Sequence, residues 1–334
     1  MTTTTRPLEM LPATPLPPDE PVAPETLDEI AYWKRERNAV ILAHNYQIGP
    51  IQDLADFTGD SLGLSQQAAR TTADTIVFCG VHFMAETAAI LAPEKTVLIP
   101  DLAAGCSLAS SIDIAQLRDW KAAHPGAVVV SYINTTADVK AESDYCVTSG
   151  NALKVVESIP ADREILFLPD MFLGTYIKNM TGRRMEIWAG ECHVHAAIRA
   201  SDIEEQRTAH PDSEFLIHPE CGCVTSTMHA LSTGRISSEG TKLLSTERMI
   251  QHARESTKES FIVATEVGVL HRLRRDNPDK TFLPVSERMI CRYMKTITVS
   301  KLLTSLRENH YQVTVPAETA ARARTAIDRM ISIV

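Results

Sequence analysis

The sequence predicts an α/β protein built from three similar small units with parallel sheets. Three apolar runs, AVILAHNYQ, AVVVSYINT and EFLIHPECG, align so that His44, Tyr132 and His218 coincide. Two further apolar runs follow in each unit, and apolar strands of four to six residues separated by amphipathic segments indicate parallel sheets covered on both faces. A cysteine then follows at an equivalent point of each unit: Cys106, Cys192 and Cys291. We therefore predict three units that each offer one thiolate to a common centre.

The length of 334 residues suits three small domains of about 80 to 100 residues each. We predict the first α/β repeat at 26–108, with the C-terminal 300–334 packing back on it, the second at 109–194 and the third at 195–299. Residues 1–25 are rich in proline and threonine and show no periodicity, so we expect a disordered or loosely attached tail.

The elements are predicted in the same order in each unit. A helix around 27–37 precedes the first strand, and IQDLADF and SLGLSQQAART are helical stretches. The second strands are expected in TIVFCG, EILFLPD and SFIVATE, and the third strands in TVLIPD, RMEIWAG and TFLPVSE. A last helix begins near Pro316, where Ala320, Ile327 and Met330 mark its apolar side.

Charge and hydropathy exclude several classes of partner. The net charge of −9 argues against nucleic-acid binding, which normally requires a basic face. No apolar run approaches the roughly 18 to 20 residues of a membrane span, and the N-terminus lacks the apolar core of a signal peptide. We expect a cytoplasmic protein whose seven cysteines are thiols or metal ligands rather than a disulfide framework.

Polar residues recur in pairs at the ends of the three first strands. Residues i and i+2 of a strand point to one side, and the carboxyl ends of parallel strands carry the functional groups of α/β proteins. A hydroxyl residue follows seventeen, seventeen and fifteen positions after the first member of each pair. The resulting candidates are His44 with Tyr46 and Ser61, Tyr132 with Asn134 and Ser149, and His218 with Glu220 and Thr233.

These residue types suit acid–base chemistry on anionic substrates. His44 and His218 titrate near neutral pH, Glu220 is a candidate base, and Tyr46 is a candidate proton donor. Asn134 and Tyr132 suit the orientation of carboxylate or carbonyl oxygens. Hydroxyl groups at helix starts bind phosphate or carboxylate, although a lone serine or threonine there is usually only a cap.

The three repeat cysteines lie 86 and 99 residues apart, too far for a local metal motif. Isolated cysteines are mostly buried small hydrophobes, but equivalent placement in three repeats favours a shared metal centre. Three thiolates without a fourth protein ligand suit a 4Fe-4S cluster with one open iron, a Lewis acid. Zinc, which more typically takes a compact mixed set of ligands, is the alternative.

The other cysteines and some polar residues remain ambiguous in the sequence. We expect Cys79, in a strand, and Cys146, in a helix-to-turn segment, to be core thiols. Cys221 and Cys223 form C-G-C, a weak signal for zinc or redox chemistry. Four further side chains could serve either function or packing: His82, Glu86, Asp170 and Lys295. His193 is expected at the surface or in packing.

The sequence resembles the quinolinate synthase family over nearly all of 27–334. The resemblance rests on AHNYQIGPIQDLADFTGDSL, FCGVHFMAETAAILAPEKTVLIPDLAAGCSLA, HPEC, the W-x-G-x-C-x-x-H run from Trp188 to His195 and the C-x-x-M-K run from Cys291 to Lys295. The family often has C-P-N-M-K at the last run, and some members have C-x-x-C-x-x-C, where this chain has Cys291 alone. The local loop shape is therefore in doubt, and a thiol switch at that point is absent.

The resemblance implies a triangular enzyme with three αβα domains in pseudo-threefold symmetry around a central active site. It implies condensation of iminoaspartate with dihydroxyacetone phosphate to quinolinate, phosphate and water in de novo NAD biosynthesis, with L-aspartate oxidase as a candidate supplier of iminoaspartate. Cys106, Cys192 and Cys291 match the ligands of the family's 4Fe-4S cluster, and the nine strand-end and hydroxyl candidates match its substrate-facing positions. The alternatives are a diphthamide-synthesis-like radical enzyme and a non-enzymatic iron-sulfur sensor.

Overall fold

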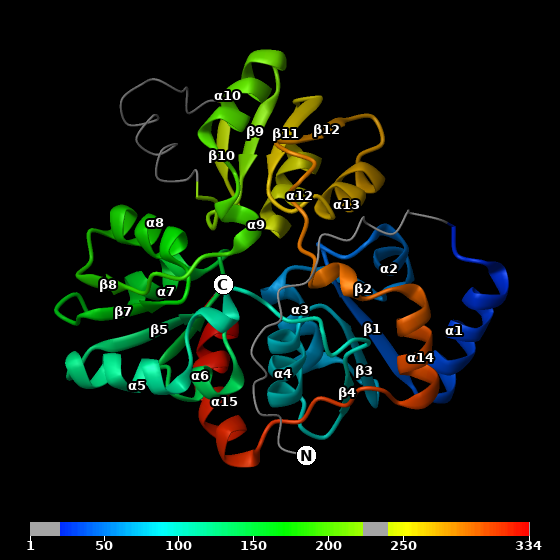
Figure 1. Ribbon diagram of the computed structural model, residues 1–334, viewed down its shortest axis with the longest axis horizontal. Coiled ribbons are helices and arrows are strands. Elements are labelled where there is room, and N and C mark those ends of the chain that lie inside the picture. The colour runs from blue at the N-terminus through cyan, green and yellow to red at the C-terminus, as the bar shows by residue number, and fades with distance from the viewer. Residues whose placement is uncertain (1–20, 223–239, 334) are drawn as a thin grey trace.

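The computed structural model describes residues 21–222 and 240–333 and contains three four-stranded parallel sheets (Figure 1). The strand orders are β2-β1-β3-β4, β6-β5-β7-β8 and β10-β9-β11-β12, so each unit repeats the same topology. The predicted α/β class with three parallel-sheet units is confirmed. The strands are β1 Ala39–His44, β2 Phe57–Gly59, β3 Thr75–Cys79, β4 Thr96–Leu98, β5 Val128–Tyr132, β6 Tyr145–Val147, β7 Ile165–Leu168, β8 Met185–Ile187, β9 Glu214–Ile217, β10 Thr241–Leu243, β11 Ser260–Ala264 and β12 Thr281–Pro284.

Helices cover the sheets and connect their strands. Every residue of β3, β5 and β7 is buried, as expected for strands between helical layers. The helices are α1 Pro24–Glu36, α2 Gly49–Leu54, α3 Ser61–Arg70, α4 His82–Leu91, α5 Ile114–Ala123, α6 Ala137–Ala141, α7 Ala152–Ser158, α8 Met171–Thr181, α9 His193–Ala196, α10 Ala200–Ala209, α12 Thr246–Glu255, α13 Val269–Asp276, α14 Val299–Glu308 and α15 Ala317–Ser332, with short 3₁₀ turns η1 Ala109–Ser111 and η2 Met294–Thr296.

One strand in each unit was not predicted from the sequence. β2, β6 and β10 have three residues each and pair in parallel with β1, β5 and β9. β4 and β8 are equally short but lie in the longer runs TVLIPD and RMEIWAG, whereas β2, β6 and β10 lie in no comparable apolar run. As a result Cys146, expected in a helix-to-turn segment, lies in β6, where it is buried as predicted.

The last two helices contact both of the first two units. α14 packs against α1 and β3, whereas α15 packs against α6 and β6 and also against α3 and α4. Two side chains hold this segment: Arg37 donates to the carbonyls of Leu306 and Arg307, and Asn151 donates to the carbonyl of Met330. Helix α1 begins at Pro24, so the last two residues of the predicted tail, 24 and 25, are helical. The unit boundaries at 108, 194 and 299 stay predictions.

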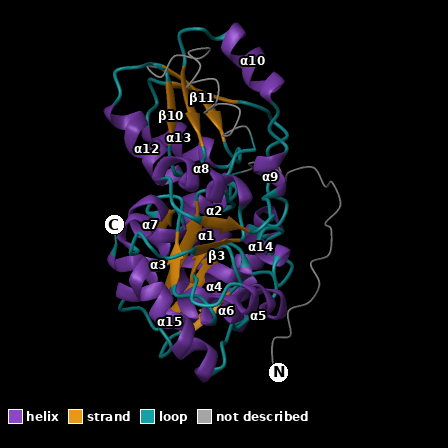
Figure 2. Ribbon diagram, turned by 90° about the vertical axis from the view of Figure 1, so that its left-hand side faces the viewer, coloured by secondary structure: helices purple, strands orange, loops and turns teal. Residues whose placement is uncertain are grey.

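The three units surround the centre of the molecule in Figure 1. Figure 2, turned by a right angle, shows β10, β11 and α10 at one end of the molecule and α15 near the other. Within 21–222 and 240–333, no helix combines the length and the apolar character that crossing a membrane requires.

Candidate active site

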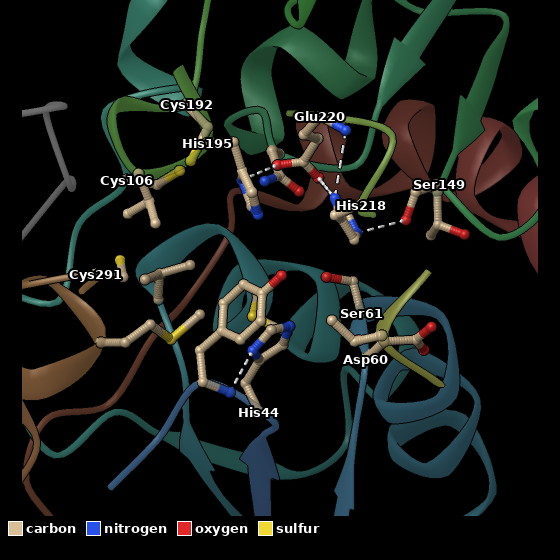
Figure 3. A pocket seen from close by; sticks show the side chains of 18 of the residues that line it. His44, Asp60, Ser61, Cys106, Ser149, Cys192, His195, His218, Glu220 and Cys291 are labelled. Carbon is tan, nitrogen blue, oxygen red and sulfur yellow. Dashed lines mark hydrogen bonds and ion pairs between the residues drawn. The ribbon is translucent and has the colours of Figure 1, made fainter. Parts of the chain in front are cut away.

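A single cavity brings together side chains from all three units (Figure 3). Its lining includes residues at or just after the ends of the first two strands of each sheet, three residues after β3 and the three repeat cysteines. Of the candidates named from the sequence, it contains His44, Tyr46, Ser61, Tyr132, Asn134, Ser149, His218, Glu220, Cys106, Cys192 and Cys291. Thr233 lies outside the described residues. In Figure 3 the three cysteines lie on one side of the cavity, and Ser61 and Ser149 lie on the other.

Glu220 is a buried carboxylate held by several donors. The Tyr132 hydroxyl donates to Oε1, and the His195 Nδ1 lies 3.2 Å from Oε2. Burial by itself would raise the pKa of Glu220, but His218, His195 and Tyr132 outweigh burial and lower the pKa from 4.5 to about 2. Glu220 is therefore ionised at neutral pH and can accept a proton.

His44 and His218 share one local geometry that explains the repeated i, i+2 pairs. The Tyr46 N–H donates to His44 Nδ1 over 3.1 Å, and the Glu220 N–H donates to His218 Nδ1 over 3.4 Å. Burial is the main cause that lowers the pKa of His44 to about 3 and that of His218 to about 4. Both rings are neutral at pH 7, and because Nδ1 accepts, the ring proton is on Nε2. His218 Nε2 lies 3.3 Å from the Ser149 hydroxyl, in position to donate to it.

A chain of close polar contacts links Tyr46 to Glu220 through two residues outside the predicted catalytic set, and its last step is the 3.2 Å contact between His195 Nδ1 and Glu220 Oε2. The Tyr46 hydroxyl lies 2.6 Å from Thr265 Oγ1, which lies 2.9 Å from His195 Nε2. Burial, and then the charge of Glu220, raise the pKa of Tyr46. The available sequence signal for Thr265 was its place after the second strand of the third unit, where a functional residue is expected at a strand end.

Neither Ser61 nor Ser149 caps a helix. Ser61 is the first residue of α3, but Asp60 provides the cap by accepting the Gly63 N–H over 2.9 Å. The residue at the N-cap position of α7 is Asn151. The two serine hydroxyls are therefore not required as helix caps, which was the alternative interpretation of their positions.

The three cavity cysteines are free, partly buried thiols. Burial raises the pKa of Cys106 to about 11 and that of Cys291 to about 12, and it raises the pKa of Cys192 well above its usual range. The charges of Cys106 and Cys291 add to the rise at Cys192, so the three sulfurs are close enough to repel one another as thiolates. Three thiolates at this point need a bound cation. The all-sulfur donor set thus fits an iron-sulfur cluster.

A mixed donor set also exists among the described residues. Ligand atoms of Cys192, His195 and Glu220 lie within 4.8 Å of one another, the kind of nitrogen, oxygen and sulfur set that zinc accepts. His195 and Glu220 already contact each other, which makes this set the weaker candidate.

The other described cysteines, Cys79, Cys146 and Cys221, do not line the cavity. Cys79 and Cys146 are fully buried in β3 and β6, and burial raises the pKa of Cys146 to about 12. Cys221 is buried and disulfide-bonded, and Cys223 lies outside the described residues.

The ambiguous polar residues take mainly structural positions. His82 Nδ1 lies 3.7 Å from Glu86 Oε1, so these two pair with each other, and Val81, Phe83 and Met84 line the cavity instead. Asp170 caps α8 by accepting the Leu173 N–H over 2.7 Å. His193 Nδ1 contacts the Ser107 hydroxyl at 2.7 Å.

Comparison with known proteins gives concordant results over nearly the whole chain. The family model described as "Quinolinate synthetase A protein" matches residues 28–332. A quinolinate synthase of Mycobacterium sp. (strain KMS) is 57% identical over 315 residues, which cover 93% of this chain and 94% of that protein. A quinolinate synthase of Thermus thermophilus is 54% identical over 305 residues (91% and 96%), and that of Pyrobaculum aerophilum is 55% identical over 303 residues (91% and 98%).

Proposed function

The chain belongs to the quinolinate synthase family and acts as a quinolinate synthase in NAD biosynthesis, and from this premise we propose the substrates, cofactor and residue roles of the reaction. The substrates are iminoaspartate and dihydroxyacetone phosphate, and the products are quinolinate, phosphate and water. The observation that carries the proposal is the convergence of strand ends from three units on one cavity, with hydroxyl groups at one side and three thiols at the other.

Both substrates are anions, and the serine side of the cavity suits them. The Ser61 and Ser149 hydroxyls are not used as helix caps, and Ser61 stands at the positive end of α3. Asn134 Oδ1 is buried without a hydrogen-bond partner, so it is available to accept from an imine N–H or a substrate hydroxyl. We assign anion binding to the two serines and substrate orientation to Asn134 and Tyr132. The equivalent role of Thr233 rests on the sequence alone.

Proton transfer is assigned to Glu220 and Tyr46, and hydrogen-bond donation to the reacting groups is assigned to His44 and His218. Ring closure requires carbon–carbon bond formation, imine formation, dehydration and loss of phosphate, and each step moves a proton. Ionised Glu220 is the base. The neutral His44 and His218 rings are donors through Nε2 rather than charged acids, because their pKa values lie near 3 and 4.

The ionised Glu220 also determines the direction of the chain to Tyr46. A carboxylate only accepts, so His195 donates from Nδ1 and accepts at Nε2 from Thr265. Thr265 then accepts from the Tyr46 hydroxyl. In the resting site Tyr46 thus points its proton toward Thr265 and offers lone pairs to the cavity. Tyr46 becomes a donor to the cavity once Glu220 has taken a proton from the substrate, because protonated Glu220 can then donate to His195 and the hydrogen bonds along the chain can reverse.

We propose that Cys106, Cys192 and Cys291 hold a 4Fe-4S cluster. The support is the all-sulfur donor set on one cavity wall and the raised pKa values of all three thiols, which favour thiolate only when a cation is bound. When bound, the iron that lacks a cysteine ligand supplies a Lewis acid beside the substrates.

Iminoaspartate is an imine that water hydrolyses, so we propose that L-aspartate oxidase supplies it close to the point of use. We expect both enzymes in the cytoplasm, where reducing conditions keep the cluster cysteines as thiols.

The test is product formation by anaerobically purified protein. Incubation with L-aspartate oxidase, aspartate and dihydroxyacetone phosphate should yield quinolinate and phosphate, measured by chromatography and a phosphate assay. A protein that is loaded with iron and yields no quinolinate contradicts the proposed substrates. Cleavage of S-adenosylmethionine by the same preparation would indicate the radical enzyme instead, and no turnover in either assay would indicate a sensor.

A further inference from the structure

A buried ion pair lies next to the cavity without lining it. Glu266 follows β11 and Lys295 lies in the turn η2, and their exposed fractions are 0% and 9%. The Lys295 Nζ lies 3.1 Å from Glu266 Oε1 and 3.3 Å from Oε2. Nothing assigned so far to the reaction uses either side chain.

Glu266 holds the backbone of the third cysteine. Its Oε1 accepts the Cys291 N–H over 3.0 Å, and its Oε2 accepts the Gly268 N–H over 2.7 Å. One carboxylate therefore sets the position of the Cys291 loop relative to the end of β11.

Lys295 reaches across to the first unit. Its Nζ donates to the main-chain carbonyl oxygen of Tyr46, the residue whose hydroxyl faces the cavity. Gln52 adds a second link, because its Nε2 donates to the carbonyls of Gln47 at 2.9 Å and Gly268 at 2.8 Å. The Tyr46 loop is thus bonded to the third unit as well as to its own strand.

Gly268 shows how closely the two loops approach. A Cβ atom there would lie 2.6 Å from Lys295 Nζ and 2.8 Å from the carbonyl carbon of Tyr46, so any side chain would displace the ammonium or the Tyr46 backbone. The close approach requires glycine at this point.

Stability alone does not account for the pair. Replacing a buried ion pair with apolar residues of similar volume is often neutral or stabilising, whereas removing one partner is strongly destabilising. The contacts that the pair makes with two functional loops give a more specific reason for its presence. We propose that Glu266 and Lys295 are positioning residues that fix the Tyr46 loop to the Cys291 loop across the junction of the first and third units.

This inference rests on the proposed roles of Tyr46 and Cys291. Turnover should depend on the link because a displacement of about 1 Å at a reacting group costs about a hundredfold in rate. Substrate binding should depend on the link less, because neither Glu266 nor Lys295 contacts the two serines or Asn134, to which we assign substrate binding.

The test uses the holoenzyme with Glu266→Gln and Lys295→Met combined. The glutamine keeps an acceptor for the Cys291 N–H, and the double change leaves no unpaired buried charge, so iron content and thermal midpoint should stay close to wild type. We expect kcat to fall about tenfold to a hundredfold with KM changed less than about threefold, and amide hydrogen exchange to accelerate in residues 45–48. Lys301→Met, in an exposed lysine that pairs with Asp101, is the matched control and should leave all five measurements unchanged.

Gln52→Met is a second variant that removes the neighbouring link without altering a charge, and we expect the same split between kcat and KM. The inference is overturned if a variant that folds and carries full iron has wild-type kcat and wild-type amide hydrogen exchange in residues 45–48. This holds for the double variant and for Gln52→Met. Failure of the proposed function gives a different result, because wild-type protein would then make no quinolinate or Tyr46→Phe would retain full turnover.

Discussion

Glu220→Gln is the substitution for which the structure predicts both a size and a sign. The contacts of the carboxylate lower its pKa from 4.5 to about 2, so it is ionised at neutral pH and accepts a charge-assisted hydrogen bond from Tyr132, which contributes about 1.5 to 3 kcal/mol. Because the pKa is depressed, this stability is fully present above the unfolded-state value and is lost as the pH falls through about 2. Glutamine has the shape of the protonated acid but no charge, so at pH 7 to 8 the variant should be less stable by about 2 kcal/mol.

For 334 residues the unfolding entropy is about 0.7 kcal/mol/K, so this loss lowers the thermal midpoint by about 3 °C. Turnover should fall about a hundredfold or more, since the base is lost. The assays are thermal unfolding and quinolinate formation under anaerobic conditions.

Glu214→Gln is the matched control for this prediction. Glu214 is also a buried carboxylate, six residues earlier on β9, and it lies 2.6 Å from His252 and away from the cavity wall. Its substitution should leave turnover unchanged. If Glu220→Gln is as stable as wild type, Glu220 is not ionised in the folded protein, and if it turns over normally, Glu220 is not the base.

Replacement of any one of the three cavity cysteines by serine should remove iron and the broad absorbance at ~400 nm that is typical of cubane clusters. Cys146→Ser should keep both. Iron retained in a cavity variant would refute the ligand set. Tyr46→Phe should lower turnover about a hundredfold with the cluster intact, and should cost only about 1 kcal/mol of stability because Thr265 keeps His195 as a partner. Acidification should weaken the fold through His44 and His218, since pKa values of about 3 and 4 against 6.5 mean that the unfolded chain binds more protons below pH 6.5. Each neutral histidine then lowers the free energy of unfolding by about 1.4 kcal/mol at pH 5.5. His44→Asn, which keeps an acceptor for the Tyr46 N–H, should lose less thermal stability than wild type between pH 7.5 and 5.5. Equal losses would show that His44 is not held neutral.

Much of the fold and part of the site could be predicted because both depend on local patterns. The first strands carry their polar residues at i and i+2, and the structure shows a local cause in two units: the N–H of the second residue donates to the Nδ1 of the histidine. The threefold repeat predicted three parallel-sheet units, and each sheet has the same strand order. The three-residue strands β2, β6 and β10 could not be predicted, because their pairing with a neighbouring strand, rather than their own composition, makes them strands.

The sequence by itself determined the class of the fold, the repeat and the residue types at the strand ends, since these follow from side-chain periodicity within about ten residues. Only the tertiary structure decided which of those residues meet. Thr265 lies between Tyr46 and His195, and Lys295 bonds to the Tyr46 carbonyl over a separation of 249 residues. Such contacts depend on how three separately formed sheets pack against one another, and no local pattern in the chain encodes that packing.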